Sequence, residues 1–302
     1  MNFRDYKEIE KLDNRLWYVF KTQNQDDKYE NKNEEYNLLK NDIIKFGSAK
    51  YEIIEKHISS SSTKSEIKSQ LNKVNNKFGS IFKYENNEIN ICEICNDTNS
   101  NEENPKVKLC KCENYKHYKC IKKSLKQNYK IEEKENENKN VISYKYEKFN
   151  CKICESQYPY KFNINNKDYP LIDLNRPEQN DYIILESLNQ IIEGKKDIKK
   201  IFVVKLTDKE ITIGKSNGND IVIDEGQNIS RNHCLLKYDK EKDLLTIIDN
   251  SKCGTSVLIK GNIKIELNKK LYFQTGNVYT KAECKEEEEL KDRNNTTINM
   301  DI

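Results

Sequence analysis

The chain has 302 residues, of which 53 are Lys or Arg and 50 are Asp or Glu, so its net charge is only +3. Apolar residues make up 35% and charged residues 34%, which excludes one large core and predicts small modules joined by solvated segments. The longest apolar runs, such as residues 16–20, are far shorter than the roughly 20 residues of a transmembrane helix, and residues 1–14 contain no apolar stretch for secretion. We expect a soluble cytoplasmic or nuclear protein with no membrane partner.

The N-terminal region contains two strand-like runs, at residues 16–20 and 36–55, in a polar background. They predict a short β-rich accessory segment over residues 1–60 that packs against its neighbours. A solvated region with a single hairpin is the alternative. A serine-rich stretch follows, so residues 61–85 are predicted to be a linker.

Ten cysteines in a chain that we expect to be cytoplasmic or nuclear argue against a disulfide framework. Seven of them lie with one histidine in four closely spaced pairs between residues 92 and 154. The eight candidate ligands are Cys92, Cys95, Cys110, Cys112, His117, Cys120, Cys151 and Cys154. A structural zinc ion takes four such ligands in a tetrahedron, so this segment predicts two Zn²⁺ ions. Closed sites leave no open position for catalysis, and we expect the metal to drive folding.

The order of these ligands, four Cys, one His and three Cys, resembles both the RING-variant (RING-CH) domain of ubiquitin ligases and the PHD finger of chromatin readers. Both families interleave their ligands, which implies that one ion binds the first and third pairs and the other binds the second and fourth. The single residue between Cys110 and Cys112 resembles RING-CH, whereas the short spacer before His117 is typical of PHD. We favour a RING-CH-like cross-brace finger over residues 86–165, with a flexible, solvated insertion near 128–142.

The RING-CH resemblance implies docking of a ubiquitin-conjugating enzyme, with Ile94 as the apolar contact inside the first Cys pair. Such ligases need no catalytic side chain of their own, because they position a charged partner enzyme. Two positions depart from the ligase pattern. Ser124 stands where several RING-CH domains have Trp, and Glu155 stands where many ligases place a cation. Activity as a RING-CH-type ubiquitin-protein ligase is therefore a hypothesis.

From about residue 182, short apolar runs recur at intervals of about 8–12 residues, separated by turn residues. This pattern is typical of a β-sandwich, which we place at residues 180–285, followed by a polar tail at 286–302. Three segments, ITIGKSNGNDIVI, ISRNHCLLKY and IIDNSKCGTSVLI, resemble the motifs of the forkhead-associated (FHA) domain. FHA domains read phosphothreonine peptides, so the resemblance implies a phosphothreonine protein as partner. The run around Gly47 also resembles the closing strands of an FHA sandwich.

The FHA resemblance assigns roles to individual residues, because a phosphate dianion needs cations, a hydroxyl and backbone N–H donors around it. The implied phosphopeptide-binding residues are Lys215, Ser230, Arg231 and Lys252. The implied architectural residues are Gly214, His233 and Gly254. Lys215 replaces the Arg of the family pattern, and Lys252 and Cys253 replace its Thr and Asn.

The predicted fold is multidomain and mainly β, with a small two-zinc cross-brace finger, a C-terminal FHA-like β-sandwich and a short β-rich N-terminal segment. The predicted function is a zinc-binding, phosphopeptide-reading protein that acts as a RING-type ubiquitin ligase recruited to phosphothreonine partners. A non-catalytic adaptor whose finger is only an interaction module is the alternative, and a histone-tail reader is a second. The lysines of residues 102–130 indicate a solvated face rather than a nucleic-acid surface. Cys234, Cys253 and Cys284 fit neither zinc site.

Overall fold

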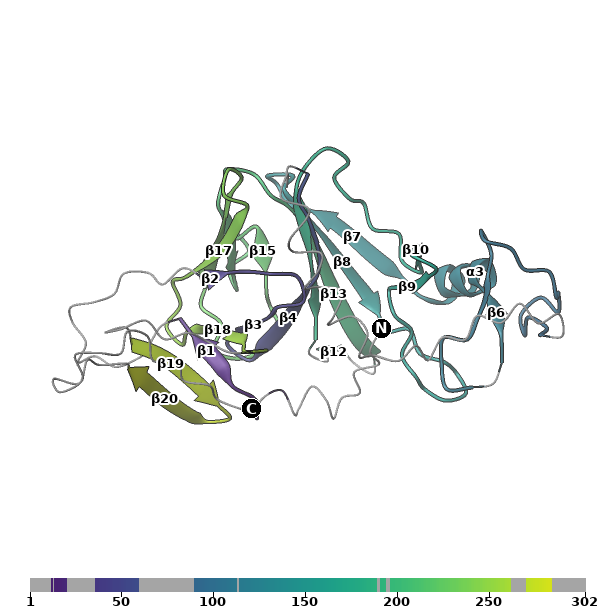
Figure 1. Ribbon diagram of the computed structural model, residues 1–302, viewed down its shortest axis with the longest axis horizontal. Helices are drawn as coiled ribbons and strands as arrows, with labels where there is room; N and C mark the ends of the chain where they lie inside the picture. The colour runs from purple at the N-terminus through teal and green to yellow at the C-terminus, as the bar shows by residue number, and fades with distance from the viewer. Residues whose placement is uncertain are drawn as a thin grey trace, which may run out of the picture.

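The computed structural model of the chain describes residues 12, 14–20, 36–59, 90–112, 114–188, 191–193, 196–261 and 270–283. The predicted linker at 61–85, the predicted tail at 286–302 and Cys284 lie outside these residues. The described part is mainly β, as predicted, with two sheets that form a sandwich and a finger beside them (Figure 1).

The larger sheet has 11 strands in the order β20-β19-β1-β18-β3-β4-β11-β13-β8-β7, with β12 paired to β13. They are β1 (Trp17–Val19), β3 (Ile43–Phe46), β4 (Ala49–His57), β7 (Ile131–Glu135), β8 (Val141–Glu147), β11 (Tyr182–Ser187), β12 (Ile191–Glu193), β13 (Lys196–Lys205), β18 (Thr255–Leu258), β19 (Lys270–Thr275) and β20 (Val278–Glu283).

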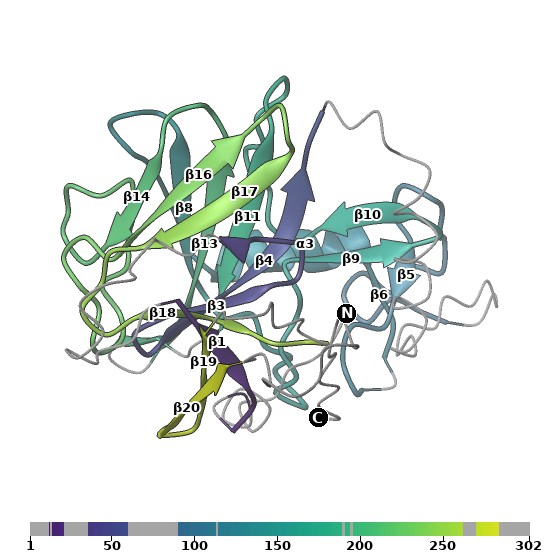
Figure 2. The same cartoon turned by 60° about the vertical axis from the view of Figure 1, so that its left-hand side comes forward.

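The smaller sheet has 5 strands in the order β15-β14-β16-β17-β2. They are β2 (Tyr36–Asn37), β14 (Ile211–Gly214), β15 (Ile221–Val222), β16 (Cys234–Asp239) and β17 (Leu244–Asp249). The finger contributes β5 (Lys106–Val107), β6 (Lys116–His117) and α3 (Tyr118–Asn128), and the hairpin of β9 (Lys161–Ile164) and β10 (Lys167–Pro170) follows it. Figure 2 shows β14, β16 and β17 lying across β11 and β13.

The two central strands β11 and β13 are buried on both faces. Ile183 and Phe202 pack into the core between the two sheets, which also contains Ile213 and Leu236 of the smaller sheet. Their neighbours Ile184 and Ile201, like Val203, point to the opposite face and share a second core with Ile121 and Leu125 of α3. Burial on both faces explains the unbroken apolar runs YIIL and IFVV, since a strand with one solvated face would alternate.

The N-terminal segment predicted as an accessory module is an integral part of the sandwich. Strand β3 pairs with β18, and β4 pairs with β11, so this hairpin lies between two strands of the C-terminal region. Strand β2 pairs with β17 in the other sheet. Residues 180–285 alone would leave β18 and β11 as separate edges, which means that the sandwich needs both ends of the chain.

The insertion predicted to be flexible near 128–142 is instead the end of α3 and part of a β-hairpin. Strand β8 pairs along its whole length with β13, and β7 pairs with β8 at the edge of the sheet. The polar sequence of β7 is misleading because an edge strand needs only one partner and commonly carries charges. Strand β8 has buried residues interspersed with partly exposed ones, and the buried residues are Val141, Tyr144 and Tyr146.

Glu55 at the end of β4 ties the N-terminal hairpin to the segment that follows the finger. Its carboxylate accepts hydrogen bonds from Arg176 Nε at 3.1 Å, Lys161 Nζ at 3.1 Å and Tyr182 Oη at 2.6 Å. Burial alone raises the pKa of Glu55, but these donors outweigh it and lower the pKa to about 2.

We expect Glu55→Gln to lower the free energy of unfolding at pH 7 by about 2 kcal/mol, because Arg176 and Lys161 lose their carboxylate partner. The folded pKa of about 2 lies below the ordinary value of 4.5, so this contribution is complete above pH 4.5 and is lost as the pH falls toward 2. Urea unfolding of both chains across this window should show their difference shrinking. Glu135→Gln, at an exposed carboxylate of β7, is the matched control and should leave the midpoint unchanged. Equal stability of the Glu55→Gln chain and the wild type at pH 7 would contradict this assignment.

Candidate functional site

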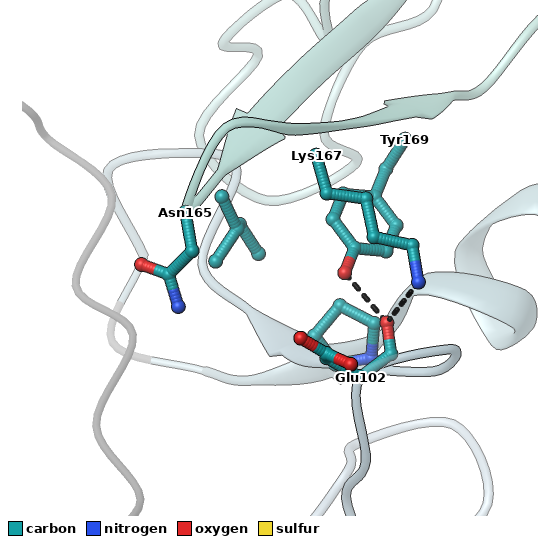
Figure 3. Close-up of a pocket in the computed structure, with 6 residues that line it drawn as sticks. Glu102, Asn165, Lys167 and Tyr169 are labelled. Atoms are coloured by element: carbon teal, nitrogen blue, oxygen red, sulfur yellow. Dashed lines mark hydrogen bonds between the residues drawn. The ribbon is translucent and has the colours of Figure 1, made fainter.

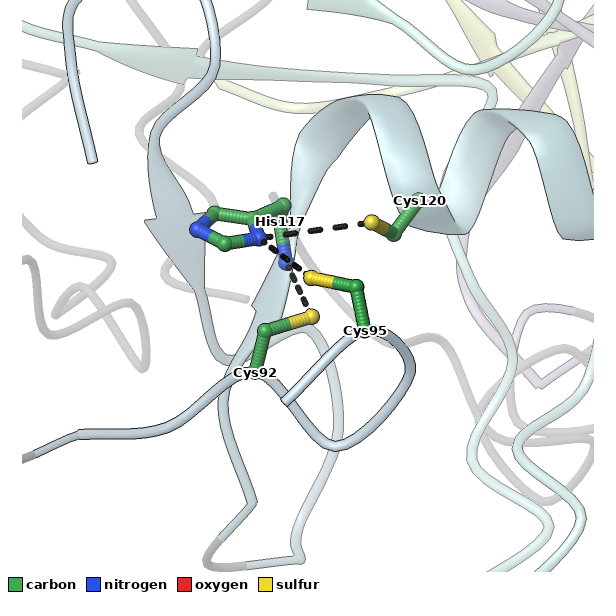
Figure 4. A group of neighbouring side chains, drawn as sticks. All are labelled: Cys92, Cys95, His117 and Cys120. Carbon is green, nitrogen blue, oxygen red and sulfur yellow. Dashed lines mark hydrogen bonds between the residues drawn. The ribbon is translucent and has the colours of Figure 1, made fainter. Parts of the chain in front are cut away.

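The first group of predicted metal ligands is Cys92, Cys95, His117 and Cys120, whose ligand atoms all lie within 4.8 Å of one another (Figure 4). The two cysteines come from a tight turn, His117 ends β6, and Cys120 lies in the first turn of α3. His117 Nδ1 is 3.3 Å from Cys95 Sγ and 4.0 Å from Cys120 Sγ. The imidazole nitrogen and the three sulfurs therefore converge on one point.

The surroundings of His117 fix its ring for this role. Its Nε2 lies 2.5 Å from the Asn99 carbonyl oxygen, which can only accept, so Nε2 carries the proton and Nδ1 presents a lone pair to the sulfurs. The buried Lys106 steadies the same loop, because its Nζ donates to the carbonyl oxygens of Asn90 and Thr98, each at 2.7 Å. A backbone carbonyl behind a ligating histidine is a common feature of metal sites.

The second group is Cys110, Cys112, Cys151 and Cys154. A tetrahedral ion with Zn–S bonds of about 2.3 Å places two sulfurs about 3.8 Å apart. Cys112 Sγ and Cys151 Sγ are 3.8 Å apart, which fits such an ion. The Ser156 hydroxyl, 3.2 Å from Cys154 Sγ, helps to lower the pKa of this thiol to about 5 and so favours the ligating thiolate. Both groups interleave in the way that the finger families imply.

We call the two C-x2-C turns knuckles, the first at Cys92–Cys95 and the second at Cys151–Cys154. The loop that follows the first knuckle is held against the β9–β10 hairpin (Figure 3). Tyr169 Oη donates to the Glu102 carbonyl oxygen at 2.6 Å, and Lys167 Nζ donates to the same oxygen at 3.3 Å. Asn165 lines the small cavity beside them. Because these polar groups satisfy each other, we assign this cavity a structural role in anchoring the finger.

The two C-x2-C pairs form the same turn. Asn96 N donates to the Cys92 carbonyl at 2.8 Å, and Glu155 N donates to the Cys151 carbonyl at 2.9 Å. Both donors have φ of 57°, in the left-handed region. The turn fixes the backbone of Glu155, the residue that replaces the cation of the ligase pattern.

A groove runs between the two knuckles and α3. Ile94 and Ile153, at the same place in the two knuckles, flank it and are 46% and 64% exposed. Leu125 and Ser124 of α3 form its wall. Ile94 was predicted as a contact residue, whereas Ile153 was missed, although the repeated C-x-Ile-C pattern was a signal that could have identified it.

The predicted phosphopeptide residues lie in three loops joined by backbone hydrogen bonds. Lys215 N donates to the Ser230 carbonyl oxygen at 3.0 Å, and Lys252 N donates to Ser230 Oγ at 3.1 Å. A Cβ on Gly214 would lie 2.2 Å from the Arg231 carbonyl oxygen, so only glycine permits this approach of two loops. The side chains of Lys215, Arg231 and Lys252 are exposed, and Ser230 is half-buried between the loops.

His233 lies under these loops and is fully buried. Its Nδ1 accepts from Ser230 N at 3.0 Å, its N donates to the Ile213 carbonyl at 2.7 Å, and its carbonyl oxygen accepts from Asn250 N at 2.9 Å. Burial lowers the pKa of His233, so the ring stays neutral and can accept this hydrogen bond. In the last loop, Gly254 has φ of 84° and donates to Ser251 Oγ at 2.7 Å.

The turn between β3 and β4 supports the loop that leads to Ser230. Ser48 N donates to the Gln227 carbonyl at 3.0 Å, and Gln227 N donates to Ser48 Oγ at 2.7 Å. A Cβ on Gly47, which has φ of 59°, would lie 2.3 Å from the Gln227 carbonyl oxygen. The N-terminal hairpin thus reaches the end of the sandwich that carries the candidate site.

The FHA-domain family model matches residues 211–276, which contain all three loops. These residues are therefore an FHA domain, as predicted, and FHA domains bind phosphopeptides. No RING-CH family model matched the chain. No curated protein and no solved structure matches it either. Among the described residues, the helices are too short or too polar to cross a membrane.

Proposed function

We propose that the chain binds phosphothreonine peptides at the loop end of its FHA domain, with Lys215, Ser230, Arg231 and Lys252 around the phosphate. The observation that carries this proposal is the linkage of three loops through Ser230, because the backbones of Lys215 and Lys252 both donate to this residue. These loops carry the exposed cations Lys215, Arg231 and Lys252. Ser230 Oγ accepts from Lys252 N and still has a proton to donate to a phosphate oxygen. Cations and a hydroxyl of this kind match the charge and the acceptor oxygens of a phosphothreonine.

We expect Lys215→Ala and Ser230→Ala each to weaken phosphopeptide binding at least tenfold, because each removes a charge-assisted hydrogen bond worth about 1.5–3 kcal/mol. The measurement is binding of the full chain to a degenerate phosphothreonine peptide library and to its unphosphorylated counterpart. Lys237→Ala, at an exposed lysine in the middle of β16, should have no effect. Unchanged binding by both loop variants would refute this placement of the site.

The two Cys/His groups are proposed to hold one Zn²⁺ ion each. Three thiolates with one imidazole, and four thiolates, are donor sets that select zinc, and the spacing of the sulfurs fits a tetrahedral ion. The ions would be structural, holding the knuckles to α3 and to the core that the finger shares with β11 and β13.

We expect two zinc ions per chain by elemental analysis, and about one after Cys110→Ser, because that change removes a ligand from the second group only. Cys253→Ser, outside both groups, should retain both ions. A chelator should lower the unfolding temperature of the whole chain, because the finger and the sandwich share a core. Fewer than two ions in the wild-type chain would contradict the assignment.

We further propose that the finger acts as a RING-type ubiquitin ligase on partners that the FHA domain recruits. The groove supports this proposal, because exposed Ile94 and Ile153 and the wall residue Leu125 offer an apolar surface to a ubiquitin-conjugating enzyme. A non-catalytic adaptor is the second candidate. It is favoured by Glu155, whose carboxylate would replace the cation that holds the charged conjugate.

The test of this proposal is discharge of ubiquitin from a panel of charged conjugating enzymes by the full, zinc-loaded chain. We expect discharge that Ile94→Ala reduces at least tenfold, because this change removes an apolar anchor from the groove. Ile91→Ala is the control, since Ile91 is 55% exposed but lies outside the groove. No discharge across the panel would favour the adaptor.

A further inference from the structure

The tip of the β7–β8 hairpin, which the chain inserts between the finger ligands Cys120 and Cys151, contacts the FHA loop that carries Lys215. Asn136 Nδ2 and Asn138 Nδ2 donate to the same Asp220 carboxylate oxygen, at 2.9 and 2.8 Å. Asp220 immediately precedes β15 and ends the loop that begins at Lys215. Two distant parts of the sequence therefore meet at one side chain.

Asp220 closes this loop through hydrogen bonds to Thr212. Its second carboxylate oxygen accepts from Thr212 N at 3.0 Å and from Thr212 Oγ1 at 2.9 Å, and its N donates back to Thr212 Oγ1 at 2.9 Å. The adjacent Asn219 donates to the carbonyl oxygens of Ser216 at 2.8 Å and Arg231 at 2.7 Å. A displacement of Asp220 would therefore pass directly to the backbone beside Lys215 and Arg231.

The hairpin tip is itself well braced, so it can act as a fixed support. Asn136 Oδ1 accepts from the N–H groups of Asn140 at 3.0 Å and Val141 at 3.1 Å, which closes the turn. Lys205 N donates to the Asn140 carbonyl at 2.8 Å and anchors the tip to β13. The other end of β8 reaches the second metal group, because Tyr146 packs in one core with Cys110 and Cys151.

We propose that Asn136 and Asn138 are positioning residues for the phosphopeptide site, through which the finger sets the affinity of the FHA domain. The proposal rests on the proposed function for the role of Lys215. The hairpin holds Asp220, Asp220 holds the ends of the β14–β15 loop, and the loop presents Lys215. Asn136 also closes its own turn, so Asn138, whose side chain bonds Asp220, is the cleaner position to change.

The test compares Asn138→Asp and Asn138→Ala with the wild type in the full, zinc-loaded chain. Asn138→Asp places a second carboxylate against Asp220, so we expect amide hydrogen exchange of residues 215–219 to be at least fivefold faster. Affinity for the best phosphothreonine peptide from the library should fall about five- to tenfold, with a smaller loss for Asn138→Ala. Adding Asp220→Asn to the Asn138→Asp chain should restore both readouts, because an amide then again faces a carboxylate.

Asn175→Ala is the matched control, since it removes another hairpin hydrogen bond, from Asn175 Nδ2 to Glu133 at 2.7 Å, away from the Asp220 contact. It should change neither exchange of residues 215–219 nor peptide affinity. Unchanged exchange in the Asn138→Asp chain would overturn the positioning role. Faster exchange without loss of peptide affinity would overturn the link to the phosphopeptide site. If the wild-type chain bound no phosphothreonine peptide, the proposed function would fail, while exchange would still decide whether Asn138 orders the loop.

Discussion

Burial of β11 and β13 on both faces is the constraint on which the rest of the structure depends. One face, with Ile183 and Phe202, closes against the smaller sheet, and the other, with Ile184 and Ile201, closes against the finger. Each such side chain contributes about 1.5–3 kcal/mol when it leaves water. Neither the finger nor the smaller sheet can be removed without exposing one face of these strands, so the two modules behave as one folding unit.

The parts of the molecule that could be predicted from the sequence are those set by residues close together in the chain. The C-x2-C turns and the FHA loops are local patterns, and their types of residue follow from metal and phosphate chemistry. Strand partners are different. Nothing in the alternation of β4 indicates that its partner is β11, more than a hundred residues later, because periodicity specifies a face and not a neighbour.

The same reason explains what was missed around the candidate site. The polar composition of residues 128–142 predicted a flexible, solvated insertion. These side chains are polar because they belong to an edge strand and a turn. Only the folded chain brings Asn138 of that turn to Asp220, and Ser48 of the N-terminal hairpin to Gln227. The proposed phosphopeptide residues and the supports Gly214, His233 and Gly254 lie within the FHA motifs, whereas the supports from distant segments, such as Asn138 and Ser48, do not.

The position of the N-terminal hairpin has a consequence for synthesis on the ribosome. Strands β3 and β4 emerge early, but β18, which pairs with β3, ends about 200 residues after β4, or roughly 10–40 s later at usual elongation rates. Strands β3 and β4 can pair with each other, but until β18 is made the other edge of β3 is unpaired. Ile43, Ile44 and Ile53 then lack the later strands of the cores that bury them in the finished fold. Pairing over such separations is slow, and unpaired apolar strands are prone to aggregate. Nascent chains of this protein should therefore depend on chaperones that hold the N-terminal hairpin until the last sandwich strands have been made.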